Sequence, residues 1–188
     1  MMKRNNFPFS AVLGLNHAKT AILIVLVNPR AGGLLISGPR GIGKSTLMRS
    51  TQELIERPWR DIPVSVTEDR LFGTIDTEKA IYSGQKKLYP GIINEADQGV
   101  LYLDDANLLR EDLLDFILNI AEVGAYQLER DGLSLRCDTS FTVIAAINPE
   151  SGMLSGACLD QFGLFVNVDN IHDENTRVEI LKRTISFE

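Results

Sequence analysis

The chain has 188 residues, of which 44% are hydrophobic and 23% charged, and its formal net charge is −6. This length suits a single domain, and the acidic balance argues against the basic face that nucleic-acid binding requires. Cys137 and Cys158 show neither metal-ligand nor disulfide spacing, so we expect reduced thiols and a cytoplasmic protein.

An apolar stretch, residues 7–15, opens the chain and leads into a helix predicted for residues 16–27, with Asn16 as its cap. This helix is apolar on almost every side, which predicts a buried position. Its apolar run, residues 21–27, is far shorter than the ~20 residues that cross a bilayer. We therefore expect no membrane span, and polar residues earlier in the stretch also argue against a signal peptide.

A glycine-rich segment follows and matches G-x-x-x-x-G-K-[ST], the phosphate-binding pattern. Residues 33–37 predict a buried strand before it and residues 45–56 a helix after it, which is the context that the motif requires. Its glycines let backbone N–H groups point at phosphate oxygens, and the helix N-terminus attracts the same anion. We expect Lys44 to reach the β- and γ-phosphates and Ser45 to bind Mg²⁺. The nucleotide-binding set is Gly38, Pro39, Arg40, Gly41, Ile42, Gly43, Lys44, Ser45 and Thr46.

The next part of the chain is less regular. Residues 62–66 are rich in β-branched side chains and predict the second strand, with Trp59 packed over the edge of the core. Residues 67–98 contain several glycines and prolines but no linker composition, which indicates an ordered excursion. Within it, residues 77–82 and 92–96 predict short helices.

Residues 100–103 are four apolar residues that run into two carboxylates, the pattern of a buried parallel strand that ends at an active-site edge. We expect Asp104 to hold Mg²⁺ opposite Ser45, as a Walker-B aspartate does. Asp105 stands where a carboxylate can orient or deprotonate the attacking water. The alternative is that the pair only caps the next helix.

Residues 108–123 carry apolar side chains at helical spacing, and Gly124 ends this amphipathic helix. Asp131 and Gly132 then lie between two short alternating runs, residues 125–128 and 133–136. An Asp-Gly pair in that position is typical of a β-hairpin turn.

The remaining chain supplies two further strands, predicted for residues 141–147 and 164–168, and a closing helix over residues 173–183. Asn148 follows the first of these strands, where its amide can contact the γ-phosphate or the water, although Asn-Pro is also a common turn signal. Strands that alternate with helices predict an α/β fold, with a five-stranded parallel sheet covered on both faces.

Together these segments resemble the ATPase subunit of magnesium chelatase, in the chelatase/MoxR-like branch of the AAA+ class of P-loop NTPases. TEDRLFGTID and the ERDG hairpin are the most specific, because they resemble insertions that distinguish chelatase-type ATPases. The resemblance implies one AAA+ domain over residues 1–188, with insertions at residues 67–98 and 125–136. The segments that carry it are FPFSAVLGLNHAK, NPRAGGLLISGPRGIGKST, TEDRLFGTIDTEKAI, YPGIINEADQGVLYLDDANLL, LERDGLSLR, INPESGML and LDQFGLFV.

The resemblance also implies a function. Members of this family form rings that bind ATP between subunits, and they cooperate with two other subunits to insert Mg²⁺ into protoporphyrin IX. The porphyrin lies mainly on the largest partner, so no tetrapyrrole pocket is expected here. Two alternatives stay open: a weakly hydrolysing nucleotide-binding platform in a homo- or hetero-oligomeric ring, and a MoxR-like remodelling ATPase that works with a von Willebrand-type domain protein.

Three departures from the family pattern bear on turnover. The family usually has Asp-Glu at the end of the Walker-B strand, and this chain has Asp104 and Asp105, so the second carboxylate is one methylene shorter. Gln161 stands where the family offers an arginine finger to a neighbour. The chain ends at Glu188, before the helical lid that carries a further ATP-sensing arginine. We therefore expect Mg·ATP binding with slow hydrolysis.

Overall fold

A five-stranded parallel sheet forms the centre of the protein. The computed structural model describes residues 7–75, 88–130 and 133–187, and in them the sheet order is β2-β5-β8-β1-β9. Every neighbouring pair of these strands is parallel, which confirms the predicted sheet. The strands are β1 (Leu34–Ser37), β2 (Trp59–Ile62), β5 (Val100–Leu103), β8 (Thr142–Ile147) and β9 (Leu164–Asn167).

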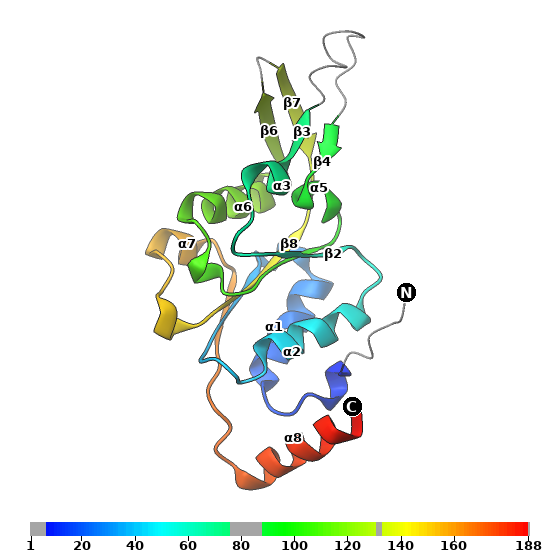
Figure 1. Ribbon diagram of the computed structural model, residues 1–188, viewed down its shortest axis with the longest axis vertical. Coiled ribbons are helices and arrows are strands. Elements are labelled where there is room, and N and C mark those ends of the chain that lie inside the picture. Colours follow the sequence, from blue (N-terminus) through cyan, green and yellow to red (C-terminus); the bar gives the residue numbers. More distant parts are fainter. Residues whose placement is uncertain (1–6, 76–87, 131–132, 188) are drawn as a thin grey trace.

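Helices cover both faces of the sheet (Figure 1). The α-helices are α1 (Asn16–Val27), α2 (Lys44–Thr51), α3 (Glu68–Phe72), α5 (Ile92–Glu95), α6 (Glu111–Val123), α7 (Gly156–Asp160) and α8 (Glu174–Phe187). Short 3-10 helices are η1 (Phe9–Ala11), η2 (Pro29–Ala31), η3 (Gln52–Leu54), η4 (Ala106–Leu108) and η5 (Pro149–Ser151).

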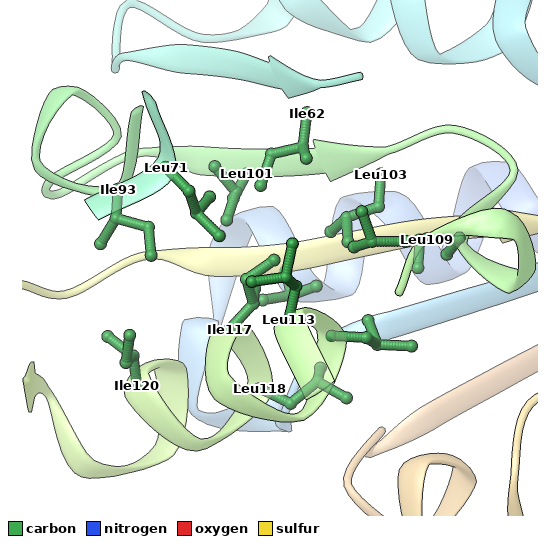
Figure 2. Close-up of a cluster of buried hydrophobic side chains, with 14 of the residues drawn as sticks. Ile62, Leu71, Ile93, Leu101, Leu103, Leu109, Leu113, Ile117, Leu118 and Ile120 are labelled. Carbon is green, nitrogen blue, oxygen red and sulfur yellow. The ribbon is translucent and has the colours of Figure 1, made fainter. Parts of the chain in front are cut away.

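Two hydrophobic clusters result, because successive side chains of a strand point to opposite faces of a sheet. Along β8, Ile144 and Ala146 join the cluster beneath α1 and α2. Val143 and Ala145 join the other cluster, beneath α3, α5 and α6, part of which Figure 2 shows. With apolar residues on both faces, β8 is buried along its whole length, as expected for a central parallel strand.

Two hairpins rise from the same end of the sheet (Figure 1). The Tyr126 hydroxyl on β6 lies within hydrogen-bond distance of two acceptors at the base of the β3–β4 pair, the backbone oxygen of Phe72 on α3 at 2.8 Å and Asn94 Oδ1 on α5 at 2.6 Å. The β6–β7 pair confirms the predicted hairpin and extends it to Asp138. The antiparallel pairs are β3 (Gly73–Ile75) with β4 (Leu88–Pro90), and β6 (Ala125–Arg130) with β7 (Leu133–Asp138).

Two expectations for α1 were wrong. Leu15, in a left-handed conformation with φ of 53°, precedes the helix, and Asn16 is its first residue rather than its cap. The helix is also buried on one side only: Leu23 and Ile24 are 44% and 45% exposed, and Val27 is 83% exposed. Only the side that faces the sheet joins a hydrophobic cluster, so an apolar surface alone did not imply full burial.

The second strand is Trp59–Ile62, not residues 62–66. Pairing with β5 begins with Trp59 opposite Val100. Proline has no N–H for a ladder, and Pro63 instead begins a turn in which Val66 N–H donates to its carbonyl at 2.9 Å. Register with the neighbouring strand therefore overrode the β-branched composition.

Other boundaries moved by smaller amounts. The helix after the phosphate-binding segment ends at Thr51 and continues as η3, short of residue 56. The helix predicted from residue 108 begins at Glu111, because residues 106–108 form η4. The closing helix reaches Phe187. The short helix predicted for residues 77–82 lies outside the described residues.

Candidate functional site

The phosphate-binding segment forms a tight turn between β1 and α2, as the sequence predicts. Gly41 and Gly43 have φ of 82° and 92°, a left-handed conformation that glycine adopts without strain. At Gly38, an added Cβ would lie 2.5 Å from the backbone oxygen of Val168 and 2.7 Å from Ile42 Cδ1. Glycine at these positions allows the close turn in which N–H groups can face an anion.

Lys44, the first residue of α2, folds back over this turn. Its side chain is only 7% exposed, and Nζ donates to the carbonyls of Gly38 at 2.6 Å and Pro39 at 2.8 Å. Burial lowers the pKa of Lys44, and the carboxylates of Asp105 and Asp104 act in the opposite direction. An ammonium group has three donors, so a third remains for a phosphate oxygen.

Ser45 and Asp104 meet across the strand edge. Ser45 Oγ donates to Asp104 Oδ2 at 3.0 Å, although the two residues are 59 positions apart in the sequence. Asp104 Oδ1 accepts from the hydroxyl of Tyr102 at 2.9 Å. Burial and the charge of Asp104 raise the pKa of Tyr102 well above its usual value, so the phenol keeps its proton.

This pair suits Mg²⁺, which prefers hard oxygen ligands and usually keeps water and phosphate oxygens around it. Ser45 and Asp104 offer a hydroxyl and a carboxylate on adjacent elements. Across residues 7–75, 88–130 and 133–187 there is no group of three or more His, Cys, Asp or Glu residues that could hold a metal ion. A divalent ion held here therefore needs nucleotide and water oxygens to complete its shell.

Asp105 and Asn148 lie at the ends of two neighbouring strands, β5 and β8. Asp105 is half-buried in a left-handed conformation with φ of 51°, and its side chain does not cap η4. Asn148 is only 2% exposed; its Oδ1 accepts from Glu150 N–H at 3.2 Å and its Nδ2 donates to Ser151 Oγ at 3.2 Å. Asn148 therefore does stabilise a turn, which is one of the two roles that the sequence allowed for it.

Sequence reasoning missed Asn107, which joins these two strand ends. Its Nδ2 donates to the carbonyls of Asn148 at 3.1 Å and Gly152 at 2.9 Å. Its position soon after Asp104 and Asp105 was the available signal, but the partners lie more than 40 residues away. The contact fixes the spacing between the Walker-B end and the Asn148 turn.

A cavity of about 490 Å³ adjoins the phosphate-binding turn and was also missed. It is lined by Val12 from the first segment, Ile42 from the turn, Thr46 from α2, and Ile171 and Ile180 from the last segment. The first and last described segments lie side by side here: the rings of Phe7 and Phe187 are 4.9 Å apart, edge to face. Its size and largely apolar lining suit the base of a nucleotide.

Gln161 lies apart from this group, at the end of α7. It is half-buried, and Nε2 donates to the carbonyl of Ala157 at 3.4 Å. The backbone beyond it is tightly held, because Gly163 N–H donates to Gly32 O at 2.7 Å, and a Cβ on Gly163 would lie 1.7 Å from Ala31 O. Among the side chains that the structure describes, no hydrogen bond joins Gln161 to the phosphate-binding turn.

The fold and this site agree with comparisons to known proteins. The AAA domain (dynein-related subfamily) model matches residues 33–161, from the phosphate-binding strand to Gln161. The magnesium-chelatase 38 kDa subunit of Cereibacter sphaeroides is 36% identical over 97% of this chain and 64% of that protein. The magnesium-chelatase subunit ChlI homolog of Methanocaldococcus jannaschii is 34% identical over 100% of this chain and 61% of that protein.

A solved structure, a model of the complex between subunits BchI and BchD of magnesium chelatase, matches with a TM-score of 0.82. The two chains are 36% identical, and the match covers 98% of this chain and 68% of the chain in that structure.

The chain therefore belongs to the AAA family and has a P-loop AAA+ core. Within that family it is related to the magnesium-chelatase ATPase subunits, as the motifs predicted. It spans about three-fifths of the length of these curated relatives, 64% and 61% of the two above. Within the described residues, no helix is both long and apolar enough to cross a membrane.

Proposed function

We propose that this chain is the ATP-binding motor part of a magnesium-chelatase-type assembly. In such an assembly, ATP binding and hydrolysis drive Mg²⁺ insertion into protoporphyrin IX on partner subunits. The observation that carries the proposal is the meeting of Lys44, Ser45 and Asp104 at one edge of the sheet. The relatives named as magnesium-chelatase subunits support it over nearly the whole chain.

Each part of the site has a task in ATP binding. The turn from Gly38 to Gly43 offers backbone N–H groups to the phosphates, and the N-terminus of α2 favours their charge. Lys44 donates its remaining N–H to the β- and γ-phosphates, and the cavity beside Ile42 receives the base. Ser45 and Asp104 hold Mg²⁺, which when bound neutralises charge on the β- and γ-phosphates.

Hydrolysis needs a positioned water and a positive charge at the γ-phosphate. Asp105 follows β5 and is the carboxylate that we assign to the water, and Asn148 follows the neighbouring strand β8. The shorter Asp105 side chain and the neutral Gln161 both weaken this half of the reaction. We therefore propose slow turnover, with Gln161 facing the ATP of a neighbouring subunit in an oligomeric ring.

The second candidate is a nucleotide-binding platform that assembles with active partners and hydrolyses little ATP. Asp105 and Gln161 favour it, whereas the retained Lys44 and Ser45 favour the motor. A MoxR-like remodelling ATPase with a von Willebrand-type domain partner shares the same core. The TEDRLFGTID stretch, which includes α3 and β3, favours the chelatase-type reading over that one.

Removal of the Lys44 ammonium group tests the binding site. A hydrogen bond to a charged group contributes about 1.5–3 kcal/mol, so we expect Lys44→Ala to weaken Mg·ATP binding about 10- to 100-fold. Calorimetric titration of the purified chain with Mg·ATP measures this change. Lys182→Ala, an exposed lysine on α8 outside the cavity lining, is the matched control and should bind normally.

Two results would contradict the proposal. If Lys44→Ala and the parent chain bound ATP with equal affinity, the nucleotide would not bind at the site proposed here. Rapid steady-state turnover by the parent chain, abolished by Lys44→Ala, would leave the site in place but refute slow hydrolysis. Mixing the chain with magnesium-chelatase partner subunits and protoporphyrin IX then tests the assembly, with ATP-dependent Mg-protoporphyrin formation as the expected result.

A further inference from the structure

The side chain of Tyr102 lies on the same side of β5 as the carboxylate that follows it. Alternation along a strand places residues two apart on one face, so Tyr102 and Asp104 point the same way. That face packs against α1 and α2, and Tyr102 belongs to the hydrophobic cluster beneath them. Asp104 emerges from the same face at the strand end, where Ser45 lies in the first turn of α2.

Both oxygens of Asp104 are occupied by donors from different elements. The Tyr102 hydroxyl donates to Oδ1 at 2.9 Å, and Ser45 Oγ donates to Oδ2 at 3.0 Å. The terminal torsion of an aspartate is broad, so a carboxylate without a fixed partner has many orientations. A donor at Oδ1 selects the orientation in which Oδ2 faces Ser45.

The phenol is itself held in place. Tyr102 is 5% exposed, and the ring of Trp59, on the neighbouring strand β2, lies 6.0 Å from its ring at an angle of 41°. The Trp59 ring is in turn fixed by a hydrogen bond from Nε1 to Asp61 Oδ1 at 2.9 Å. The hydroxyl of Tyr102 is therefore a rigid donor, delivered from the core side of the metal site.

We propose that Tyr102 is a positioning residue of the Mg·ATP site: its hydroxyl holds Asp104 so that Oδ2 stays beside Ser45, where the metal binds. The inference rests on the proposed function, because it assigns a task within the same site. Tyr102 acts on the metal through Asp104, to which its hydroxyl donates. Hydrogen-bond partners of metal ligands typically change metal affinity about 10- to 100-fold when they are removed.

The test separates metal binding from nucleotide binding. The ratio of the ATP dissociation constant in EDTA to that in excess Mg²⁺ measures the contribution of the metal. We expect Tyr102→Phe to reduce this ratio about tenfold, which is the lower end of the range for hydrogen-bond partners of metal ligands. The ATP affinity in EDTA should be unchanged. Tyr126→Phe is the matched control, since it removes a half-buried phenol outside the site, which lies within hydrogen-bond distance of the Phe72 backbone oxygen and Asn94 Oδ1.

A ratio that is unchanged or increased in Tyr102→Phe would overturn the inference, as would an equal decrease in Tyr126→Phe. Absence of ATP binding by the parent chain, with and without Mg²⁺, would instead overturn the proposed function.

A double-mutant cycle with Asp104→Asn gives a second, independent measurement. Once Asp104 is neutral, deletion of the Tyr102 hydroxyl should no longer change the Mg²⁺ contribution. Additive effects of the two substitutions would show that Tyr102 does not act through Asp104. If Tyr102→Phe failed to fold while Tyr126→Phe folded, the hydroxyl would be needed for stability rather than positioning, and the inference would fail.

Discussion

The phosphate-binding edge of the sheet and the end of α7 differ in how their side chains are held in place. At the edge, Lys44, Ser45 and Asp104 are fixed by side-chain hydrogen bonds of 2.6–3.0 Å from this chain alone. At the end of α7, the backbone is tightly packed at Gly163, but the Gln161 side chain makes one long hydrogen bond of 3.4 Å to its own helix.

We propose that this difference separates ATP binding, which one chain can do alone, from action on the nucleotide of a neighbour in the proposed ring. Side chains that bind a nucleotide must be in place before it arrives, and those at the edge are in place. A side chain that acts on the nucleotide of a neighbour needs a fixed backbone and a free end. The α7 segment fits the finger position that we propose for Gln161, although glutamine lacks the charge of the arginine that the family resemblance implies there.

The largest expected effect comes from restoring both altered side chains. Arginine fingers contribute about 10³–10⁵-fold in rate, so we expect Asp105→Glu with Gln161→Arg to raise turnover about 10³-fold. In the proposed ring the finger acts across a subunit boundary, so the gain should fall when the protein is diluted. Steady-state phosphate release, measured over a range of protein concentrations, checks both expectations.

The matched control combines Asp105→Glu with Gln127→Arg, which adds the same charge on the exposed β6 strand. An equal gain in that control would show that the position of Gln161 is irrelevant. A gain in the double variant that does not depend on protein concentration would show that the finger acts within one chain. That result would contradict the proposal that Gln161 faces the ATP of a neighbouring subunit.

The two regions also differ in how far the sequence predicts them. The phosphate-binding turn and the Walker-B end are local patterns, and the structure brings Lys44, Ser45 and Asp104 together as expected. The contacts of Tyr102 and Asn107 with this edge were not foreseen. The first joins side chains two residues apart at the end of β5, and the second needs a loop more than 40 residues away.

The same reason explains the errors in the fold. The second strand moved because Trp59 pairs with Val100, and one side of α1 is exposed because only the other side meets the sheet. The cavity was missed because the first and last segments of the chain form part of its lining. Composition and periodicity describe one element at a time, whereas these features depend on which elements meet.

A second prediction tests the backbone support of Gln161. A Cβ at Gly163 would lie 1.7 Å from Ala31 O, and a backbone atom cannot move aside as a flexible side chain can. Overpacking of this kind costs about 3 kcal/mol, so we expect Gly163→Ala to lower the free energy of unfolding by that amount in urea. Gly156→Ala, with open space around its Cβ, should be within about 0.5 kcal/mol of the parent.

A stability for Gly163→Ala equal to that of Gly156→Ala would show that the α7 segment is not pinned to the turn between α1 and β1. Gln161 would then lack the fixed backbone that distinguishes a side chain offered to a neighbour from an ordinary surface residue.

The smallest effect should follow Asp105→Glu alone. A positioned base contributes roughly 10²–10⁴-fold to a rate, but its contribution depends on the other groups that act in the same transition state. With Gln161 unchanged, no positive charge from α7 meets the γ-phosphate, and we expect a gain of less than about tenfold in steady-state phosphate release. A gain from Asp105→Glu that equals that of the double variant would mean that hydrolysis is limited at the sheet edge, and that Gln161 is not the missing component.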